Sequence, residues 1–381
     1  MEPEIKIHYG ADAIHSIRNV WEALQHHPNS DYEHFMLVCG LRPEVIAPWV
    51  LSVWNSGQCR ALVTGRTEQG MLRPPIGYVR LPGIPARVLT IIHEGVLGEL
   101  DDKGAEAIVT ALDQTLCRRE AEVVSIHMLC EENSLWQALR RRSIQALGLN
   151  HTRWMTHRAL KLEKEPGFLI RNMRSKHRSW IRRKERELEE AFPGKVYWEW
   201  HSQVLDMPAL CERMEAVAMT TYQRGLGAGF NDNRETRERL ALFARRGQIR
   251  VLLLEIDGLP KAYWLGTVYG KVFHASATGY SPDMTGFEVG TLAFHRMVDE
   301  LVREGIDLLD FGLGDAYYKE RFADLSWREA SIQLFARSIK GRFLHGYLGA
   351  SVWLDDFARR VAKRLGILDR VKQAWRARLR I

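Results

Sequence analysis

The order of hydrophobic patterns between residues 195 and 336 constrains the fold more than any other feature of the sequence. A predicted strand is followed by two helical stretches, three strands joined by tight turns, an amphipathic helix, a strand, a short helix and a last strand. These elements are expected at 195–201, 207–224, 234–246, 249–255, 261–269, 271–280, 290–303, 306–311, 316–322 and 329–336. This alternation predicts an α/β lobe with a mixed central sheet.

The first half of the chain shows the same kind of alternation. Strands are expected at 59–65, 88–94, 122–129 and 153–162, and helices at 102–118 and 134–146. At about 150 residues per domain, a chain of 381 residues is expected to form two lobes and an additional segment. We place the lobes at 1–165 and 166–339, and a helical tail at 340–381.

Charge and cysteine content narrow the function classes. Residues 340–381 contain 11 basic and 3 acidic residues, whereas the whole chain carries only +7, so the basic charge is concentrated in the tail. This distribution argues against a nucleic-acid partner. The five cysteines show no metal-ligand spacing and the start of the sequence has no secretion signal, so we expect a cytoplasmic protein without a metal.

A charged helix is expected at 171–192, with eight basic residues mostly in its first part and four glutamates near its end. Positive charge at a helix N-terminus opposes the helix dipole. Two interpretations follow. The basic residues contact a partner, or the helix is solvated and its charges form pairs four residues apart.

Residues 310–322 contain the most specific motif of the chain, Asp310-Phe311-Gly312-Leu313-Gly314-Asp315 followed by Tyr318-Lys319 and Phe322. It resembles the DFG-x-GD-x-x-YK-x-x-F signature of the GNAT-related acetyltransferases of cellulose and exopolysaccharide synthesis, the CelD/BcsL-like family. Upstream, Val289-Gly290-Thr291-Leu292 is similar to the turn that precedes the family's long helix.

The resemblance implies a fold and an activity. The family is similar in fold to Fem-type aminoacyltransferases, which contain two GNAT lobes, so we expect tandem GNAT-like lobes of the α/β (α+β) class with mixed sheets. The implied activity is an acyl-CoA-dependent N- or O-acyltransferase, an acetyltransferase acting on a small-molecule or saccharide acceptor in exopolysaccharide or cell-envelope biosynthesis. Acetyl-CoA or another acyl-CoA is the implied co-substrate, and the second lobe carries the chemistry.

Val289, Gly290 and Thr291 are the candidate residues for binding the donor. A glycine at a strand-to-helix turn exposes backbone N–H groups, and the helix dipole favours the negative charge of a pyrophosphate. A purely structural helix start is the alternative, because the turn has one glycine rather than three.

The candidate catalytic residues are Asp315, Tyr318 and Lys319. Asp315 could deprotonate or orient the acceptor, or it could cap the following short helix. Tyr318 could protonate the departing thiolate, or it could only pack against the core. Lys319 is expected to bind phosphate or substrate. Glu288 is a second candidate base.

The candidate acceptor site has residues from three segments. His274, Ser276, Thr278 and Tyr280 are expected on one side of a strand, because side chains alternate with period two. Asp310 is expected to be buried, as a structural residue or as part of the site. Arg224 precedes a glycine-rich stretch that could close over substrate or serve as a linker.

The tail predicts a basic amphipathic helix with tryptophans, interrupted near Gly366 and Asp369. It could bind an anionic membrane, which would make the protein peripheral on the inner face of the cytoplasmic membrane, or dock on a partner or on the catalytic lobe. Two other functions stay open. They are a Fem-type aminoacyl-tRNA-dependent transferase, suggested by the basic helix, and a non-catalytic scaffold that binds an envelope polymer.

Overall fold

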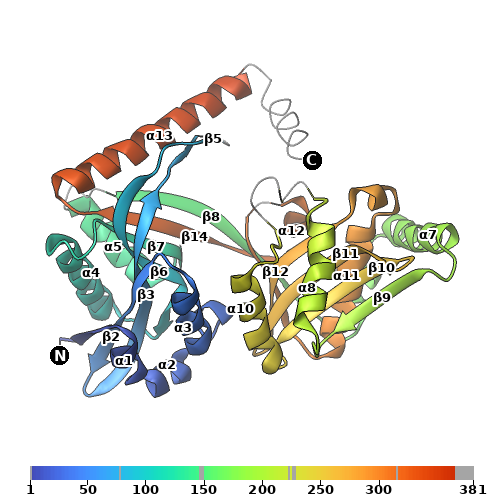
Figure 1. Ribbon diagram of the computed structural model, residues 1–381, viewed down its shortest axis with the longest axis horizontal. Coiled ribbons are helices and arrows are strands. Elements are labelled where there is room, and N and C mark those ends of the chain that lie inside the picture. The colour runs from blue at the N-terminus through green and yellow to red at the C-terminus, as the bar shows by residue number, and fades with distance from the viewer. Residues whose placement is uncertain are drawn as a thin grey trace. The chain divides into compact units, whose positions relative to one another are not determined.

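The computed structural model describes residues 2–76, 79–145, 150–221, 224, 229–314 and 316–364 (Figure 1). The chain forms two compact units. The first contains residues 2–156 and 327–364 of the described chain, and the second contains residues 157–326. The last strand and the helix after it therefore group with the first unit, whereas the sequence placed 327–339 in the second lobe.

The first unit is a sheet in the order β1-β2-β3-β6-β7-β14-β8 with helices packed on it. Its elements are β1 (Glu4–Tyr9), α1 (Ala11–His15), α2 (Arg18–Leu24), η1 (Pro28–Ser30), α3 (Tyr32–Leu41), β2 (Val45–Asn55), β3 (Gln58–Leu72), β4 (Pro75–Ile76), β5 (Val79–Arg80), β6 (Ile84–Gly98), α4 (Asp102–Cys117), β7 (Val123–Cys130), α5 (Ser134–Gln145), β8 (Asn150–Lys161), β14 (Leu325–Phe335) and α13 (Ile339–Arg364). The end of β8 from His157 and the start of β14 belong to the second unit.

The second unit is a sheet in the order β8-β13-β12-β11-β10-β9. Its elements are α6 (Phe168–Arg171), α7 (Ser175–Ala191), β9 (Val196–His201), α8 (Met207–Ala218), α10 (Arg234–Arg245), β10 (Ile249–Ile256), β11 (Leu259–Tyr269), β12 (Val272–Tyr280), η2 (Pro282–Phe287), α11 (Val289–Arg303), β13 (Leu308–Leu313) and α12 (Tyr317–Phe322). Helix α11 packs on one face of this sheet, and α8 and α10 pack on the other.

Each unit contains a parallel strand pair within a sheet that is mainly antiparallel. In the first unit this pair is β6 and β7, connected by α4, and in the second it is β12 and β13, connected by α11. In each unit the second strand of the pair is followed in sequence by a further helix, α5 or α12. The two units thus repeat one arrangement, which confirms the predicted tandem α/β fold with mixed sheets.

Local sequence explains the long helix of the second unit. The apolar residues of α11 recur every three or four positions, so that Leu292, Met297, Val298 and Leu301 are all buried on one face. Gly305 then adopts a φ of 73°, which ends the helix without the steric cost that a side chain would add. The prediction of a helix at 290–303 is confirmed to within one residue.

The sequence interpretation missed most of the first 55 residues, where the structure has β1, three helices and β2. Several of these elements are short, so their sequences show no clear period. Strand β2 is longer, with 11 residues, but its central residues are buried on both faces and show no alternation. The predicted tail helix is present as α13 up to Arg364, and its expected breaks at Gly366 and Asp369 lie outside the described residues. In the part of the chain that is described, no helix is both long and apolar enough to cross a membrane.

Candidate active site

The parallel strands β12 and β13 pair over only three positions. Their last pair joins His274 to Asp310, although β12 continues to Tyr280 and β13 to Leu313. Past this pair each strand keeps its other neighbour, which is β11 for β12 and β8 for β13. Beyond this pair the described residues of β12 and β13 no longer pair with each other. Strand edges of this kind can hydrogen-bond an extended chain.

The equivalent point of the first unit is chemically different. There the parallel pairing of β6 and β7 ends with Ile91 and Ile126, both of which are buried apolar residues. A buried carboxylate of that unit, Glu329, lies on β14 and accepts a hydrogen bond from Trp327 Nε1 at 2.7 Å. The second unit, by contrast, places an imidazole and a carboxylate at the last parallel pair.

Asp310 is the centre of a buried polar cluster. Its Oδ1 lies 2.6 Å from His157 Nε2, and its Oδ2 lies 3.0 Å from His274 Nδ1. The backbone N–H of Gly312 donates to Oδ1 at 2.6 Å. His157 is 2% exposed and Asp310 is 8% exposed, so the cluster is shielded from water.

The charge state of the cluster follows from these contacts. Burial alone raises the pKa of the Asp310 carboxyl, but hydrogen bonds from His157 and His274, together with their charge interactions, hold this pKa well below its usual range. An ionised carboxylate only accepts hydrogen bonds, so both imidazoles donate to Asp310. The Nδ1 of His274 then carries a proton, which makes its Nε2 the basic nitrogen of that ring.

A β-bulge at Ser276 changes which side chains share a face. Thr267 lies opposite His274 and Trp264 lies opposite Thr278, but the register shifts between these two pairs. His274 therefore shares the sheet face of α8 and α10, whereas Thr278 shares the face of α11 with Trp264. The prediction that His274 and Thr278 lie on one side of the strand is wrong, because the extra residue reverses the alternation.

Tyr280 is on the α11 face, next to the predicted donor turn. A Cβ built on Gly290 would lie 2.9 Å from Tyr280 Cδ1, so the aromatic ring occupies the space that a side chain would need. Val289 is buried in the core, and Thr291 Oγ1 donates to Glu288 Oε2 at 3.4 Å. The three residues form the first turn of α11, where the sequence predicted a turn leading into the helix, and the contact with Tyr280 leaves room only for glycine at position 290. Their binding of the donor stays a prediction.

Two other predicted residues connect α12 to the end of β13. Lys319 Nζ donates to the carbonyl oxygens of Phe311 and Leu313 at 2.6 and 2.7 Å. The ring of Tyr318 lies edge-on to Trp264 and Phe311, with centroids 5.8 and 6.0 Å away. Lys319 thus attaches α12 to the end of β13. Asp315 lies outside the described residues.

Arg224 is on the same side of the sheet as His274. Its guanidinium forms an ion pair with Glu215 of α8 and donates to the carbonyl oxygen of Phe230 at 2.8 Å. Phe230 packs against Tyr263, and burial raises the pKa of the Tyr263 hydroxyl. These contacts give Arg224 a structural role in holding the segment after α8, and its predicted contact with substrate stays a prediction.

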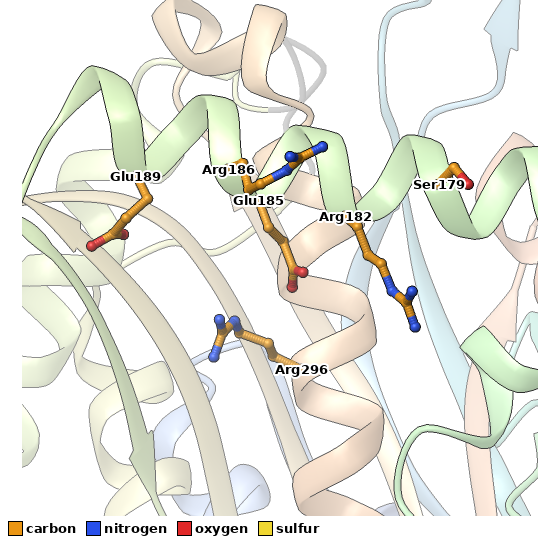
Figure 2. Close-up of a pocket in the computed structure, with 6 residues that line it drawn as sticks. All are labelled: Ser179, Arg182, Glu185, Arg186, Glu189 and Arg296. Atoms are coloured by element: carbon orange, nitrogen blue, oxygen red, sulfur yellow. The ribbon is translucent and has the colours of Figure 1, made fainter.

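A groove of about 570 Å³ lies between α7 and α11 (Figure 2). Figure 2 shows Arg182 and Arg296 extending from the two helices toward the space between them, with Glu185 of α7 pointing to the same side. Arg296 also lies over the Trp198 ring, 4.9 Å from its centroid. The groove is lined by Ser179, Arg182, Glu185, Arg186, Glu189 and Arg296. The basic helix predicted at 171–192 therefore presents arginines to a concave surface of mixed charge.

His157 is the functional candidate that the sequence interpretation missed. It lies in β8, far in sequence from Asp310, and a histidine in a strand of mixed polarity gives no local signal of its partner. The other residues of the cluster, His274 and Asp310, were predicted as acceptor-site residues. The structure brings these two together and separates them from Thr278 and Tyr280, which lie on the opposite face.

Comparison with known families identifies the class of the second unit. Residues 175–320 match the family model described as "Acetyltransferase (GNAT) domain". The matched segment runs from α7 to α12 and includes His274, Gly290 and Asp310, but not His157. The second unit thus contains a segment that matches a GNAT acetyltransferase domain, and this match supports an acyltransferase activity.

Comparisons of whole chains are less specific. No curated protein matches the sequence. Among solved structures, FemX has a TM-score of 0.48 and 11% identity, covering 75% of this chain and 87% of that one. A tandem GNAT protein from the clavulanic acid biosynthesis pathway has a TM-score of 0.49 and 12% identity, and the match covers 88% of this chain and 99% of that one. A GCN5-related N-acetyltransferase from Sphaerobacter thermophilus has a TM-score of 0.46 and 12% identity, and the match covers 88% of this chain and 96% of that one.

Proposed function

We propose that the second unit transfers an acyl group from acyl-CoA to an amine or hydroxyl at the point where β12 and β13 separate. The observation that carries this proposal is the position of the His274–Asp310 pair at the last rung of the parallel ladder. It supplies an oriented imidazole next to two open strand edges, inside a domain that matches GNAT acetyltransferases.

The donor is assigned to the α11 face. The pantetheine arm of CoA is an extended chain with two amides, which suits the open edge of β12 beyond His274. The N-terminus of α11, with Gly290 and Thr291, supplies backbone N–H groups and the positive end of a helix dipole for the pyrophosphate. Acetyl-CoA is the proposed donor, and longer acyl-CoAs are tested beside it in the binding experiments.

The acceptor is assigned to the opposite face, which carries His274. The acceptor N–H or O–H gives its proton to His274 Nε2 as its nitrogen or oxygen forms a bond to the thioester carbonyl carbon. The carbon–sulfur bond breaks, and the sulfur takes up a proton to leave as free CoA. Asp310 holds the His274 ring and stabilises its protonated form, and His157 supports Asp310 from the other side.

The loop after β13 supplies the remaining proposed roles. Asp315 orients the acceptor, and Tyr318 of α12 donates the proton to the departing sulfur. Lys319 keeps α12 attached to the end of β13 through its two carbonyl contacts. Because Lys319 follows Tyr318 directly, these contacts hold Tyr318 near the end of the strand that carries Asp310.

The proposed acceptor class is a saccharide or small molecule of exopolysaccharide or cell-envelope biosynthesis. The support is the run from Asp310 to Phe322, which resembles the CelD/BcsL-like signature. An acceptor screen therefore begins with amino sugars and hydroxyl-bearing saccharides, and simple amines serve as the comparison set.

Release of free CoA thiol, measured with acetyl-CoA across these acceptors, tests the proposal. The wild-type protein is expected to release thiol in an acceptor-dependent way, and His274→Ala is expected to reduce this rate about 100-fold or more. His201→Ala is the matched control, because His201 pairs with Glu199 at 2.9 Å on β9 and is expected to keep its rate. Equal rates for His274→Ala and the control would refute the role of His274.

The groove between α7 and α11 favours one alternative, a transferase of the Fem type that uses aminoacyl-tRNA. Arg182, Arg186 and Arg296 would then bind RNA phosphates, and binding would weaken steeply with salt. Titration of charged tRNA into the wild-type protein and into Arg182→Ala/Arg186→Ala distinguishes the two functions. Tight, salt-dependent tRNA binding that the double variant loses would favour the alternative over acyl-CoA.

A further inference from the structure

Helix α13 has two apolar faces, and the described residues cover only one of them. Leu344 and Leu348 pack against Ala86, Val123 and Phe335 of the first unit. Two polar contacts and one pair of stacked rings add to this packing. Tyr347 donates to the carbonyl oxygen of Pro82 at 2.9 Å, Lys340 pairs with Glu122 at 3.1 Å, and His345 stacks on His151. The first half of α13 is therefore firmly attached to the unit.

The second apolar face is exposed. At 100° per residue, its members fall within a sector of about 100° that points away from Leu344 and Leu348. We call this the outer face, and it consists of Phe343, Ala350, Trp353, Leu354, Phe357 and Val361. Phe343, Trp353 and Phe357 are 60%, 59% and 51% exposed, and the rings of Trp353 and Phe357 stack with centroids 5.5 Å apart. Figure 1 shows α13 as one long helix of the first unit.

Charge borders the outer face in an ordered way. By the same helical geometry, Arg342 and Arg360 lie along one side of the outer face, and Arg364 lies within it at its C-terminal end. Asp355 and Asp356 lie away from it. The segment from Lys340 to the C-terminus contains 11 basic and 3 acidic residues. An exposed aromatic stripe with a basic border is typical of a helix that lies in the interface of an anionic bilayer.

We propose that the outer face of α13 docks the protein on an anionic lipid surface. The aromatic side chains insert between lipid headgroups, and the flanking arginines contact lipid phosphates. The positive charge of this segment favours an anionic lipid surface over a second copy of the chain as the binding partner of the outer face. Two identical helices docked by this face would bring two segments of net charge +8 together, which like-charge repulsion opposes.

The proposal is independent of the acyltransferase chemistry. The outer face belongs to the first unit, whereas His274, Gly290 and Asp310 belong to the second. A variant of the outer face is therefore expected to lose membrane binding and to keep its affinity for acetyl-CoA.

Flotation of the full chain with vesicles tests the proposal. Vesicles of phosphatidylcholine with 30% phosphatidylglycerol are compared with vesicles of phosphatidylcholine alone. The wild-type protein is expected to float with the anionic vesicles, at least tenfold more than with the neutral ones, and to be released by high salt. Absence of flotation with anionic vesicles, or equal flotation with both, would overturn the proposal.

Two variants and a control locate the binding. Phe343→Glu/Phe357→Glu is expected to reduce flotation at least tenfold. The control Leu205→Glu/Leu259→Glu makes the same change at exposed leucines of the second unit and is expected to float like wild type. Arg342→Glu/Arg360→Glu keeps the apolar face and is expected to lose the preference for anionic lipid, which provides a second test should the first variant fold poorly. Wild-type flotation by both variants, or self-association that depends on the outer face without vesicle binding, would refute the proposal.

Discussion

The Nδ1 of His274 lies 3.0 Å from the Oδ2 of Asp310, across the last rung at which the parallel strands β12 and β13 pair. The same carboxylate is held from the other side by His157, so the orientation of the His274 ring depends on a buried charge. In the first unit the corresponding rung joins Ile91 to Ile126. This difference places the proposed chemistry in the second unit.

Asp310→Asn tests whether this charge supports transfer. An amide cannot accept from both imidazoles as a carboxylate does, so His274 loses its fixed tautomer and its stabilised protonated form. The acceptor-dependent rate of thiol release is expected to fall about 100-fold or more, whereas the dissociation constant for acetyl-CoA stays within about threefold. If the variant lost acetyl-CoA binding and thiol release to the same extent, the substitution would have damaged the whole unit, and this role of Asp310 would be contradicted.

Gly290→Ala tests the close contact at the start of α11. The added methyl group would lie 2.9 Å from the Tyr280 ring, which must shift and displace the proposed donor turn. Gly286→Ala is the matched control, because nothing lies within 4 Å of its Cβ position. Titration calorimetry is expected to show weaker acetyl-CoA binding for Gly290→Ala alone. Equal weakening by both substitutions would show that the contact with Tyr280 is not the cause.

His295 predicts a pH dependence of stability. It is 5% exposed, neither ring nitrogen has a hydrogen-bond partner among the described residues, and burial lowers its pKa to about 4, helped by nearby Arg321 and His177. Because the unfolded chain binds this proton near pH 6.5, the free energy of unfolding falls as the pH drops from 6.5 toward 4. This one group contributes a loss of about 2 kcal/mol between pH 7 and pH 5.

Urea unfolding of wild type and His295→Leu at the two pH values measures this effect. The leucine variant is expected to lose less stability on acidification, by about that amount, because the contributions of all other groups cancel in the comparison. Identical pH dependence of the two proteins would mean that His295 takes up a proton in the folded state as readily as in the unfolded state.

The two faces of α13 predict opposite responses to truncation. Leu344 is fully buried, so Leu344→Ala is expected to cost about 2–4 kcal/mol of unfolding free energy through lost burial and a cavity. Phe357 is 51% exposed, and Phe357→Ala is expected to change stability by less than about 0.5 kcal/mol. Chemical denaturation measures the unfolding free energy of both variants. Equal losses of stability would contradict the assignment of Leu344 to the covered face and Phe357 to the outer face.

Elements with strong local patterns could be predicted from the sequence. The apolar spacing of α11, its glycine at 305 and the hairpin at Asp257-Gly258 are local signals, and the structure has these features at the expected places. The short helices of the first 55 residues gave weaker signals, because one or two turns carry too few apolar positions to show a period.

The candidate site could be predicted only in part, because its geometry depends on strand pairing. His274 and Asp310 were predicted as site residues, but the bulge at Ser276 appears only in the register of β12 against β11. The partnership of Asp310 with His157 joins residues 153 positions apart. Periodicity within one segment contains no information about either feature.

The most direct test of the central claim is calorimetric titration of acetyl-CoA into the wild-type protein and into Gly290→Glu, which adds a negative charge and a side chain at the first turn of α11. We predict binding by the wild type and its loss in Gly290→Glu, while Asp310→Asn still binds. No heat with acetyl-CoA or longer acyl-CoAs over several temperatures, or unchanged binding by Gly290→Glu, would contradict an acyl-CoA site at the separation of β12 and β13.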